Sequence, residues 1–233
     1  MKSRELKPRT GLIHALDVVE LEKCIKIAQQ VEPFVDAIKL SWPFILKNGG
    51  EGMLAVRDRI ELPIVACFKV VDIPEVSRDI VKLAIQYGAN GITLQGFVGT
   101  DTMKECIELA HRLSAQTFMV TEMSHPGAVE FIQPVGEKLA KMAKQLGSDG
   151  IVAPATRPEN ITRYRKIVGN EILIMSPGVG PQGGQLGDAL QAGANFEVIG
   201  RRIYLASDPA KEAEQYANVL SKIIEKKQPL LEA

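Results

Sequence analysis

Eight short apolar runs recur along the chain, and longer amphipathic stretches separate them. Most of these runs are apolar throughout, which is typical of strands that are covered on both faces. The runs span residues 12–16, 34–40, 64–69, 91–94, 117–121, 150–153, 172–175 and 196–200. Eight strand–helix units in 233 residues predict an α/β chain folded as a (β/α)8 TIM barrel, with a doubly wound open sheet as the alternative.

The stretches between the runs have the spacing of helices that bury one face. In 20–30, for example, Cys24, Ile25 and Ala28 fall on one side, and 137–146 shows the same pattern. Asp101 is expected to be the N-cap of a helix over 102–113, and Asp208 with the proline after it is expected to open the last helix.

No linker or low-complexity segment divides the sequence, so we predict one domain over residues 1–233. Within it, 1–11 is expected to be an N-terminal extension of the barrel and 221–233 a C-terminal tail.

The composition excludes several classes of protein. Lys and Arg together number 28, as do Asp and Glu, and this balance argues against binding of nucleic acid through bulk positive charge. No run approaches the ~18 apolar residues of a membrane span, so no membrane partner is expected. The three cysteines suit neither a disulfide framework nor a zinc site, which indicates a reducing cytoplasm. No two histidines have metal-ligand spacing, so no metal is expected.

Charged and thiol side chains end three consecutive runs. Asp17 and Lys39 end the first and second, and Cys67 and Lys69 point to one face of the third because Phe68 separates them. Barrel enzymes carry their chemistry at these strand ends. Any one of these residues is ordinarily a solvated charge, but two neighbouring lysines favour function because burying both is costly without an anion.

A second set of candidates follows the seventh and eighth runs. The segment 176–184 reads SPGVGPQGG, and Gly200-Arg201 follows one unit later. Glycines let backbone N–H groups approach an anion closely, and a helix is expected to begin just after them. These two loops are the usual phosphate site of the fold, so the pattern predicts phosphate binding, although a lone glycine-rich turn would be weak evidence.

Other polar and aromatic residues receive structural interpretations. His14 lies within the first run and His111 on a predicted helix, so both are expected to be structural. His125 follows the fifth run, where packing of the loop is favoured over a role as a base. Trp42 follows the second run and is expected to pack at the barrel rim.

Four segments in this order resemble orotidine 5′-phosphate decarboxylase in its compact archaeal form. They are FKVVDIP at 68–74, TEMSHPG at 121–127, SPGVGPQGG at 176–184 and IGRRIY at 199–204, and the resemblance extends over about 12–220. It implies a homodimer of (β/α)8 barrels that converts orotidine 5′-monophosphate to UMP without a cofactor or a metal. Related barrel enzymes that act on sugar phosphates lack the second and third segments.

The resemblance also implies roles for residues of the predicted array. Lys69 would protonate C6 of the pyrimidine as CO2 leaves. Asp17 and Lys39 would bind the ribose hydroxyls and brace the array. Asp72, with Ile73, would reach into the site of the neighbouring subunit.

The same resemblance implies how the nucleotide is bound. Ser124 would contact the pyrimidine ring, while Gln182, Gly200 and Arg201 would hold the phosphate. The loop that starts at Pro177 would close over the substrate. These phosphate contacts agree with the phosphate site predicted from the glycines. The energy of binding the phosphate can also help to lower the barrier at the distant reacting centre.

Three residues depart from the family pattern. Cys67 stands where the motif Asp-x-Lys-x-x-Asp has its first Asp, Val76 where a ribose-contacting Thr is usual, and Gln95 where His is usual. Cys67 between two lysines is either a thiolate that restores part of the lost charge or a small apolar residue, and both interpretations stay open. Loss of a carboxylate from the array is expected to slow turnover.

Three functions therefore remain in view. The first is an orotidine 5′-phosphate decarboxylase with normal or impaired turnover. The second is a homologue that binds UMP-like nucleotides without useful turnover, and the third is another barrel enzyme that acts on a phosphorylated sugar. The segments around Ser124, Gln182 and Arg201 argue against the third but do not separate the first two.

Overall fold

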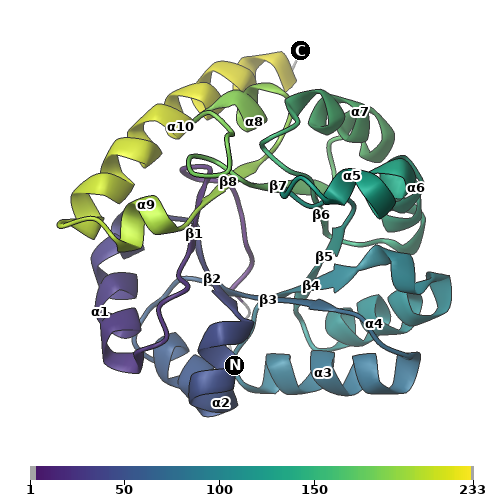
Figure 1. Cartoon of the computed structure of the whole chain (residues 1–233), viewed down its shortest axis with the longest axis horizontal. Coiled ribbons are helices and arrows are strands. Elements are labelled where there is room, and N and C mark those ends of the chain that lie inside the picture. The colour runs from purple at the N-terminus through teal and green to yellow at the C-terminus, as the bar shows by residue number, and fades with distance from the viewer. Residues whose placement is uncertain (1–3, 232–233) are drawn as a thin grey trace.

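Eight parallel strands pair in sequence order, and the last returns to the first, which closes the sheet into a barrel (Figure 1). The structure is a computed structural model that describes residues 4–231, with side chains as far as 227. The strands are β1 (Leu12–Ala15), β2 (Ala37–Ser41), β3 (Ile64–Val70), β4 (Gly91–Gln95), β5 (Gln116–Val120), β6 (Gly150–Val152), β7 (Leu173–Pro177) and β8 (Phe196–Ile199). The predicted (β/α)8 barrel is confirmed, and the open sheet is excluded.

Helices surround the barrel and bury one face each against the strands (Figure 1). They are α1 (Leu21–Val31), α2 (Trp42–Arg57), α3 (Pro74–Gln86), α4 (Thr100–Arg112), α6 (Gly136–Leu146), α7 (Pro158–Val168), α8 (Asp188–Gln191) and α10 (Pro209–Leu231). Shorter helical turns lie in the connections: η1 (Glu32–Phe34), η2 (Gly96–Val98), α5 (Ala128–Phe131), η3 (Gln133–Val135) and α9 (Arg201–Tyr204). Cys24 and Cys106 are fully buried on α1 and α4, as their helical spacing predicts.

Aromatic side chains fill the inside of the barrel. Phe118 and Phe196 are fully buried there, in one apolar cluster with Val65 and Met175. A Cβ atom at Gly150 would lie only 2.4 Å from the Phe118 ring, so the large and small residues of neighbouring strands complement each other.

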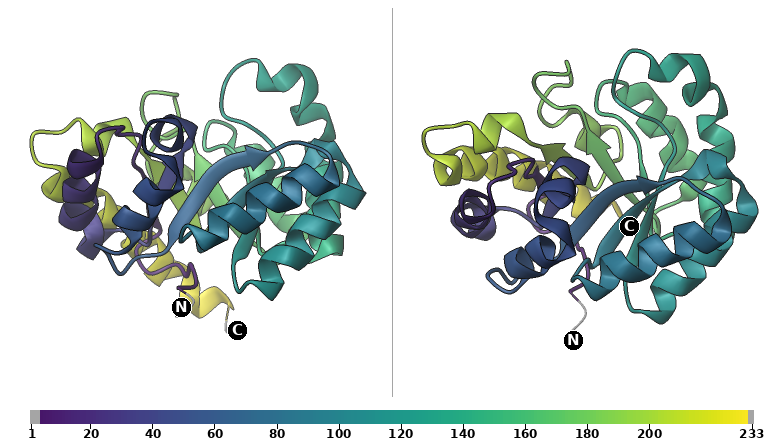
Figure 2. Two further views of the ribbon diagram at one scale, coloured as in Figure 1. Left: turned by 90° about the horizontal axis from the view of Figure 1, so that it is seen from below. Right: turned by 60° about the horizontal axis from the view of Figure 1, so that its bottom comes forward.

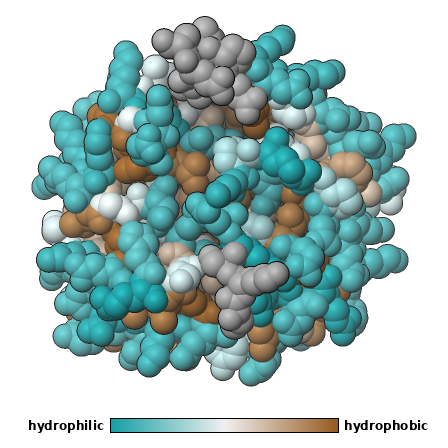
Figure 3. Space-filling view, turned by 180° about the vertical axis from the view of Figure 1, so that it is seen from behind, coloured by the Kyte–Doolittle hydropathy of each residue, from teal (hydrophilic) through white to brown (hydrophobic). Residues whose placement is uncertain are grey.

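The N-terminal segment closes the lower end of the barrel. Leu6 is buried in the interior cluster, and its backbone N–H donates to the side-chain carbonyl of Gln116 at 2.7 Å. The buried Asp36 carboxylate accepts backbone N–H bonds from Arg9, Thr10 and Gly11. Figure 2 shows both chain ends on this side and the long loops on the opposite one. Hydrophilic residues dominate the lower face, with apolar residues scattered between them (Figure 3).

The structure corrects two predictions about where elements begin. The second strand begins at Ala37 rather than at 34. Glu32–Phe34 forms a helical turn, and the Asp36 carboxylate is hydrogen-bonded to the backbone of the N-terminal segment. Asp101 is not an N-cap: the helix starts at Thr100 after Gly99, whose φ is +113°, and Asp101 lies in the first turn.

The residues expected as a tail from 221 onward are helical as far as the end of α10, while 1–3 and 232–233 lie outside the described residues. The start of α10 agrees with the prediction, since Asp208 accepts the backbone N–H of Lys211 at 3.1 Å. In the part of the chain that the structure describes, no helix has the length and apolar character needed to cross a membrane.

Candidate active site

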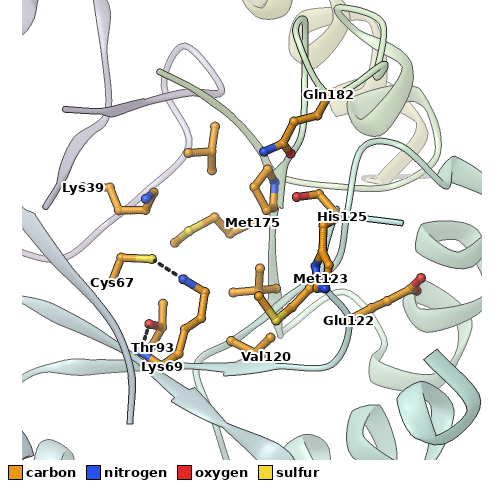
Figure 4. Close-up of a pocket in the computed structure, with 14 residues that line it drawn as sticks. Lys39, Cys67, Lys69, Thr93, Val120, Glu122, Met123, His125, Met175 and Gln182 are labelled. Carbon is orange, nitrogen blue, oxygen red and sulfur yellow. Dashed lines mark hydrogen bonds between the residues drawn. The ribbon is translucent and has the colours of Figure 1, made fainter. Parts of the chain in front are cut away.

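The end of β3 has an irregular backbone that presents Cys67 and Lys69 to the barrel mouth. The register with β4 shifts between Ala66 and Val70, which marks a bulge. Lys69 has φ +47°, a left-handed conformation that is costly for a residue with a Cβ atom. The Lys69 ammonium donates to the Cys67 sulfur at 3.4 Å, so both predicted residues face the same space (Figure 4).

Two neighbouring side chains hold this strained segment. Thr93 of β4 accepts the backbone N–H of Lys69 at 2.9 Å. Trp42, at the start of α2, donates its indole N–H to the Phe68 carbonyl at 2.8 Å, and the two rings stack with centroids 4.6 Å apart. Trp42 therefore packs at the rim as expected and also positions the β3 backbone, a role that its place in the sequence did not reveal.

Lys39 of β2 joins the same charge cluster although it is buried. Burial alone would lower the pKa of Lys39, but the Cys67 thiolate and the Asp17 carboxylate outweigh it and raise that pKa. Burial alone would also raise the pKa of the Cys67 thiol, but Lys39 and Lys69 outweigh it and lower that pKa. Asp17 accepts a hydrogen bond from the Ser41 hydroxyl at 2.5 Å. These directions favour the thiolate interpretation of Cys67.

Lys39, Cys67 and Lys69 line a cavity of about 380 Å³ at the carboxyl ends of the strands. Its walls are largely apolar, with Val120, Val152, Met175 and Val198 among them, and Figure 4 shows Cys67 and Lys69 pointing into it. A space of this size fits a small organic ligand. Its other lining residues are Lys39, Cys67, Lys69, Thr93, Glu122, Met123, Ser124, His125, Pro177 and Gln182.

A smaller, polar cavity of about 170 Å³ adjoins the first and shares Lys39, Pro177, Gln182 and Val198 with it. Its other lining residues include Asp17, which follows β1, and Gly200, Arg201, Arg202 and Tyr204, which follow β8. The structure thus brings together the residues predicted to bind the ribose and the phosphate. An anion placed there would lie beside two guanidinium groups.

The loop after β7 has a fixed shape that glycines permit. Gly178 and Gly180 have φ of +112° and +82°, and the Gly180 N–H donates to the Gly184 carbonyl at 2.8 Å. A Cβ atom at Gly178 would lie 3.0 Å from the Ser124 Cβ atom. The loops after β5 and β7 therefore meet across the mouth of the larger cavity.

The helix expected just after these glycines does not contribute to an anion site. Helix α8 begins at Asp188, and the buried Glu197 carboxylate already accepts the N–H groups of Gly187, Ala189 and Leu190. The expected helix is therefore present, but the N–H groups at its start already bind Glu197. The Gly200-Arg201 junction at the start of α9 lines the polar cavity instead.

Three predicted site residues lie outside both cavities of their own chain. Asp72 and Ile73 follow β3, and Val76 lies in the first turn of α3. All three are exposed, and the Asp72 carboxylate accepts the Ile73 N–H at 2.8 Å. Gln95, at the end of β4, is buried, and its side-chain carbonyl has no hydrogen-bond donor.

Sequence reasoning missed a buried network behind the Ser124 loop. The fully buried Glu122 carboxylate accepts bonds from Gln133 at 3.0 Å and from Tyr164 at 2.8 Å. Arg157 donates to that carboxylate and also to the Met123 carbonyl. This network fixes the loop that carries Ser124 to the loop after β6. The sequence signal that could have predicted this network is Glu122, a carboxylate at the end of an otherwise apolar run.

His14 and His111 have the structural places that were expected for them. His14 is fully buried, and its Nδ1 lies 2.9 Å from the Ile199 carbonyl; burial lowers its pKa to about 4. His111 pairs with Asp149 at 2.9 Å on the outside of the barrel. His125 lines the larger cavity from its loop. Within residues 4–231, no group of three or more His, Cys, Asp or Glu side chains is arranged to hold a metal ion.

Comparison with known proteins agrees with this geometry. The model of the "Orotidine 5′-phosphate decarboxylase / HUMPS family" matches residues 10–216. Orotidine 5′-phosphate decarboxylase of Methanosarcina barkeri is 46% identical over 213 residues, which is 91% of this chain and 95% of that protein. The same enzyme of Methanococcoides burtonii is 43% identical over 217 residues, covering 93% and 100% of the two chains.

A solved structure is similar over nearly its whole length. Orotidine 5′-monophosphate decarboxylase of Methanocaldococcus jannaschii, crystallised with the inhibitor BMP, aligns with a TM-score of 0.85 and 42% identity. The alignment covers 90% of this chain and 98% of that one. The resemblance inferred from the four segments is thereby confirmed, and the chain belongs to the orotidine 5′-phosphate decarboxylase / HUMPS family.

Proposed function

We propose that this chain decarboxylates orotidine 5′-monophosphate to UMP. The observation that carries the proposal is the juxtaposition of two cavities, one largely apolar with Lys69 and Lys39 in its wall, the other polar with Arg201. A pyrimidine ring and its carboxylate suit the first, and a phosphate suits the second. Relatives that share 40–46% identity with the chain carry the name of this enzyme.

In the proposed reaction, the bond between C6 and the carboxylate breaks, and CO2 leaves. The electron pair stays on C6, and the Lys69 ammonium donates the proton that completes UMP. Its contacts with Cys67 and Thr93 hold Lys69 in place before the substrate arrives. Groups that are prepositioned for the developing charge stabilise a transition state without the cost of reorganisation.

The positions of the side chains support the remaining proposed roles. Lys39 and Asp17, in the wall of the polar cavity, bind the ribose hydroxyls. Ser124 contacts the ring from the apolar cavity. Gln182, together with Gly200, Arg201 and the loop that begins at Pro177, holds the phosphate.

Cys67 supplies the negative charge between the two lysines in this proposal. Its lowered pKa favours a thiolate, which balances part of the positive charge of Lys39 and Lys69. A thiolate has one acceptor atom where a carboxylate has two, so it can satisfy fewer ammonium donors. We therefore expect the chain to turn over more slowly than its own Cys67→Asp variant.

Two subunits complete the site in the proposed homodimer. Val71 and Ile73 are 53% and 60% exposed beside Asp72, and Val76 is 41% exposed on the same segment. Neighbouring exposed apolar residues of this kind are typical of a protein interface. Burying them against a second copy would carry Asp72 towards the partner's cavity. The cytoplasm is the proposed compartment, because Cys24, Cys67 and Cys106 are all free thiols.

The test compares the parent protein with Cys67→Asp and Cys67→Ser. Purified protein is incubated with orotidine 5′-monophosphate, and loss of substrate absorbance is followed together with formation of UMP. We expect turnover by the parent, faster turnover by Cys67→Asp and slower turnover by Cys67→Ser, which lacks the thiolate.

Two results would contradict the proposal. Turnover by Cys67→Asp alone would show that the parent has lost the activity. If neither the parent nor Cys67→Asp converted orotidine 5′-monophosphate while both bound UMP, the chain would be a nucleotide-binding homologue instead.

A further inference from the structure

Cys67 lies between the ammonium groups of Lys39 and Lys69, and neither has a carboxylate oxygen within ion-pair distance among the described residues. Its sulfur is 3.4 Å from the Lys69 nitrogen on its own strand, and the buried Lys39 faces it from β2. The ion pairs formed within residues 4–231 include neither lysine. Burying an ammonium group without an ion pair is costly, so an anion in the cavity beside it would be stabilised.

The other charged groups near the sulfur do not remove this positive field. Asp17, which follows β1, contributes one negative charge that acts on Lys39, against the two positive charges of Lys39 and Lys69, and Thr93 from β4 is neutral. Two neighbouring ammonium groups favour the thiolate form of this sulfur, and the thiolate is the reactive form of cysteine towards oxidants.

Access distinguishes Cys67 from the other two cysteines of the chain. Its side chain lines the cavity of about 380 Å³, which admits small molecules (Figure 4). Cys24 and Cys106 line neither cavity, and both are fully buried in the helical layer. Burial raises the pKa of their thiols to about 12 and about 11. The chain thus contains two internal controls for the reactivity of the third thiol.

We propose that Cys67 is a site of reversible oxidation by hydrogen peroxide or small organic hydroperoxides. The thiolate attacks one peroxide oxygen, an S–O bond forms, and the O–O bond breaks. The sulfur is oxidised, and the peroxide is reduced to hydroxide or alkoxide, which takes a proton from an adjacent ammonium group. The product is a sulfenic acid, which returns that proton to the lysine and remains as the sulfenate anion.

Both lysines then stabilise the oxidised form, because the sulfenate keeps the negative charge that they surround. No second cysteine lines the cavity to form an internal disulfide. Reduction therefore needs an external thiol. One thiol molecule forms a mixed disulfide with Cys67 and releases hydroxide, and a second releases Cys67 as the thiolate while its proton converts the hydroxide to water. Oxidation places an oxygen atom beside Lys69 and is expected to stop any turnover that uses this cavity.

The test measures peroxide oxidation at each cysteine of the native protein. Hydrogen peroxide is added in the presence of dimedone, which traps sulfenic acids, and each cysteine peptide is quantified by mass spectrometry. We expect Cys67 to be labelled about tenfold faster than Cys24 or Cys106, since thiolate character and access set the rate. Glutathione added without dimedone is expected to remove the added oxygen.

Variants separate the effect of charge from that of exposure. Lys69→Met is expected to slow labelling of Cys67, Lys69→Arg to retain most of the rate, and Cys106→Ser to leave it unchanged. Thermal unfolding followed by circular dichroism verifies that each variant is folded. Equal labelling of all three cysteines, no effect of Lys69→Met in a folded variant, or failure of glutathione to reverse the modification would overturn the proposal. The labelling does not require decarboxylase activity, so the two proposals can fail separately.

Discussion

The indole N–H of Trp42 donates to the Phe68 carbonyl at 2.8 Å while the Trp42 ring stacks on the Phe68 ring. Phe68 lies between Cys67 and Lys69 in the bulged end of β3, so this contact holds the backbone that presents both side chains. The left-handed conformation of Lys69 persists because such neighbours determine it.

Replacing Trp42 with Phe tests this contact. The variant keeps an aromatic ring but loses the donor, so the Phe68 carbonyl becomes unpaired. We expect the free energy of unfolding, measured with urea, to fall by about 1 kcal/mol. The proposed turnover should fall as well, because Lys69 is less firmly positioned. Phe68→Leu is the matched control, since it loses the stacking but keeps the carbonyl; turnover that fell further in the control would refute the importance of the hydrogen bond.

Replacing Arg201 with Ala tests the phosphate end of the site. A hydrogen bond to a charged group contributes about 1.5–3 kcal/mol, so the Kd for UMP should rise about tenfold or more. Calorimetry with UMP and with uridine separates the causes, because only the nucleotide carries the phosphate. Arg163→Ala, on the exposed face of α7, is expected to leave both affinities unchanged. Equal weakening of UMP and uridine would assign Arg201 another role.

Acid should destabilise the fold through His14. Burial lowers the pKa of His14 from 6.5 to about 4, so between these values the unfolded chain binds a proton that the folded chain does not. Stability from this group is complete above pH 6.5 and declines as the pH falls towards 4, by about 3 kcal/mol. The measurement is urea unfolding of the parent and His14→Gln at pH 7 and pH 4.5. If both proteins lose the same stability, His14 does not cause the loss.

The exposed segment after β3 is predicted to form the interface between subunits. Ile73→Arg places a charge on that surface and should give monomers in sedimentation analysis, with reduced turnover because Asp72 no longer reaches the partner. Val219→Arg, on α10, is the matched control, since Val219 is also partly exposed but lies on a different side of the barrel (Figure 1). Dimers that persist in Ile73→Arg would place the interface elsewhere.

Continuous apolar runs were sufficient to predict the eight strands, because each strand is buried between the barrel interior and the helices. Lys39, Cys67 and Lys69 could be predicted to lie close together, since the carboxyl ends of parallel strands meet at one end of the barrel. The predicted ends of the strands were wrong where a side chain forms hydrogen bonds with a segment far away in the sequence. Asp36, for example, binds the N-terminal backbone, and this shortens β2.

Contacts between residues far apart in sequence were beyond such reasoning. Nothing local indicates that Trp42 bonds to the backbone of β3, or that Glu197 occupies the N–H groups at the start of α8. The bulge at Lys69 likewise arises from pairing with β4 and not from a glycine or proline signal.

The most direct test concerns Lys69 as the proton donor. Parent protein and Lys69→Ala are each mixed with orotidine 5′-monophosphate, UMP formation is measured by chromatography, and UMP binding is measured by calorimetry. Removing a positioned general acid costs about 10²-fold or more in rate. We expect Lys69→Ala to bind UMP and to lose at least that much turnover, whereas turnover equal to that of the parent would contradict the proposed mechanism.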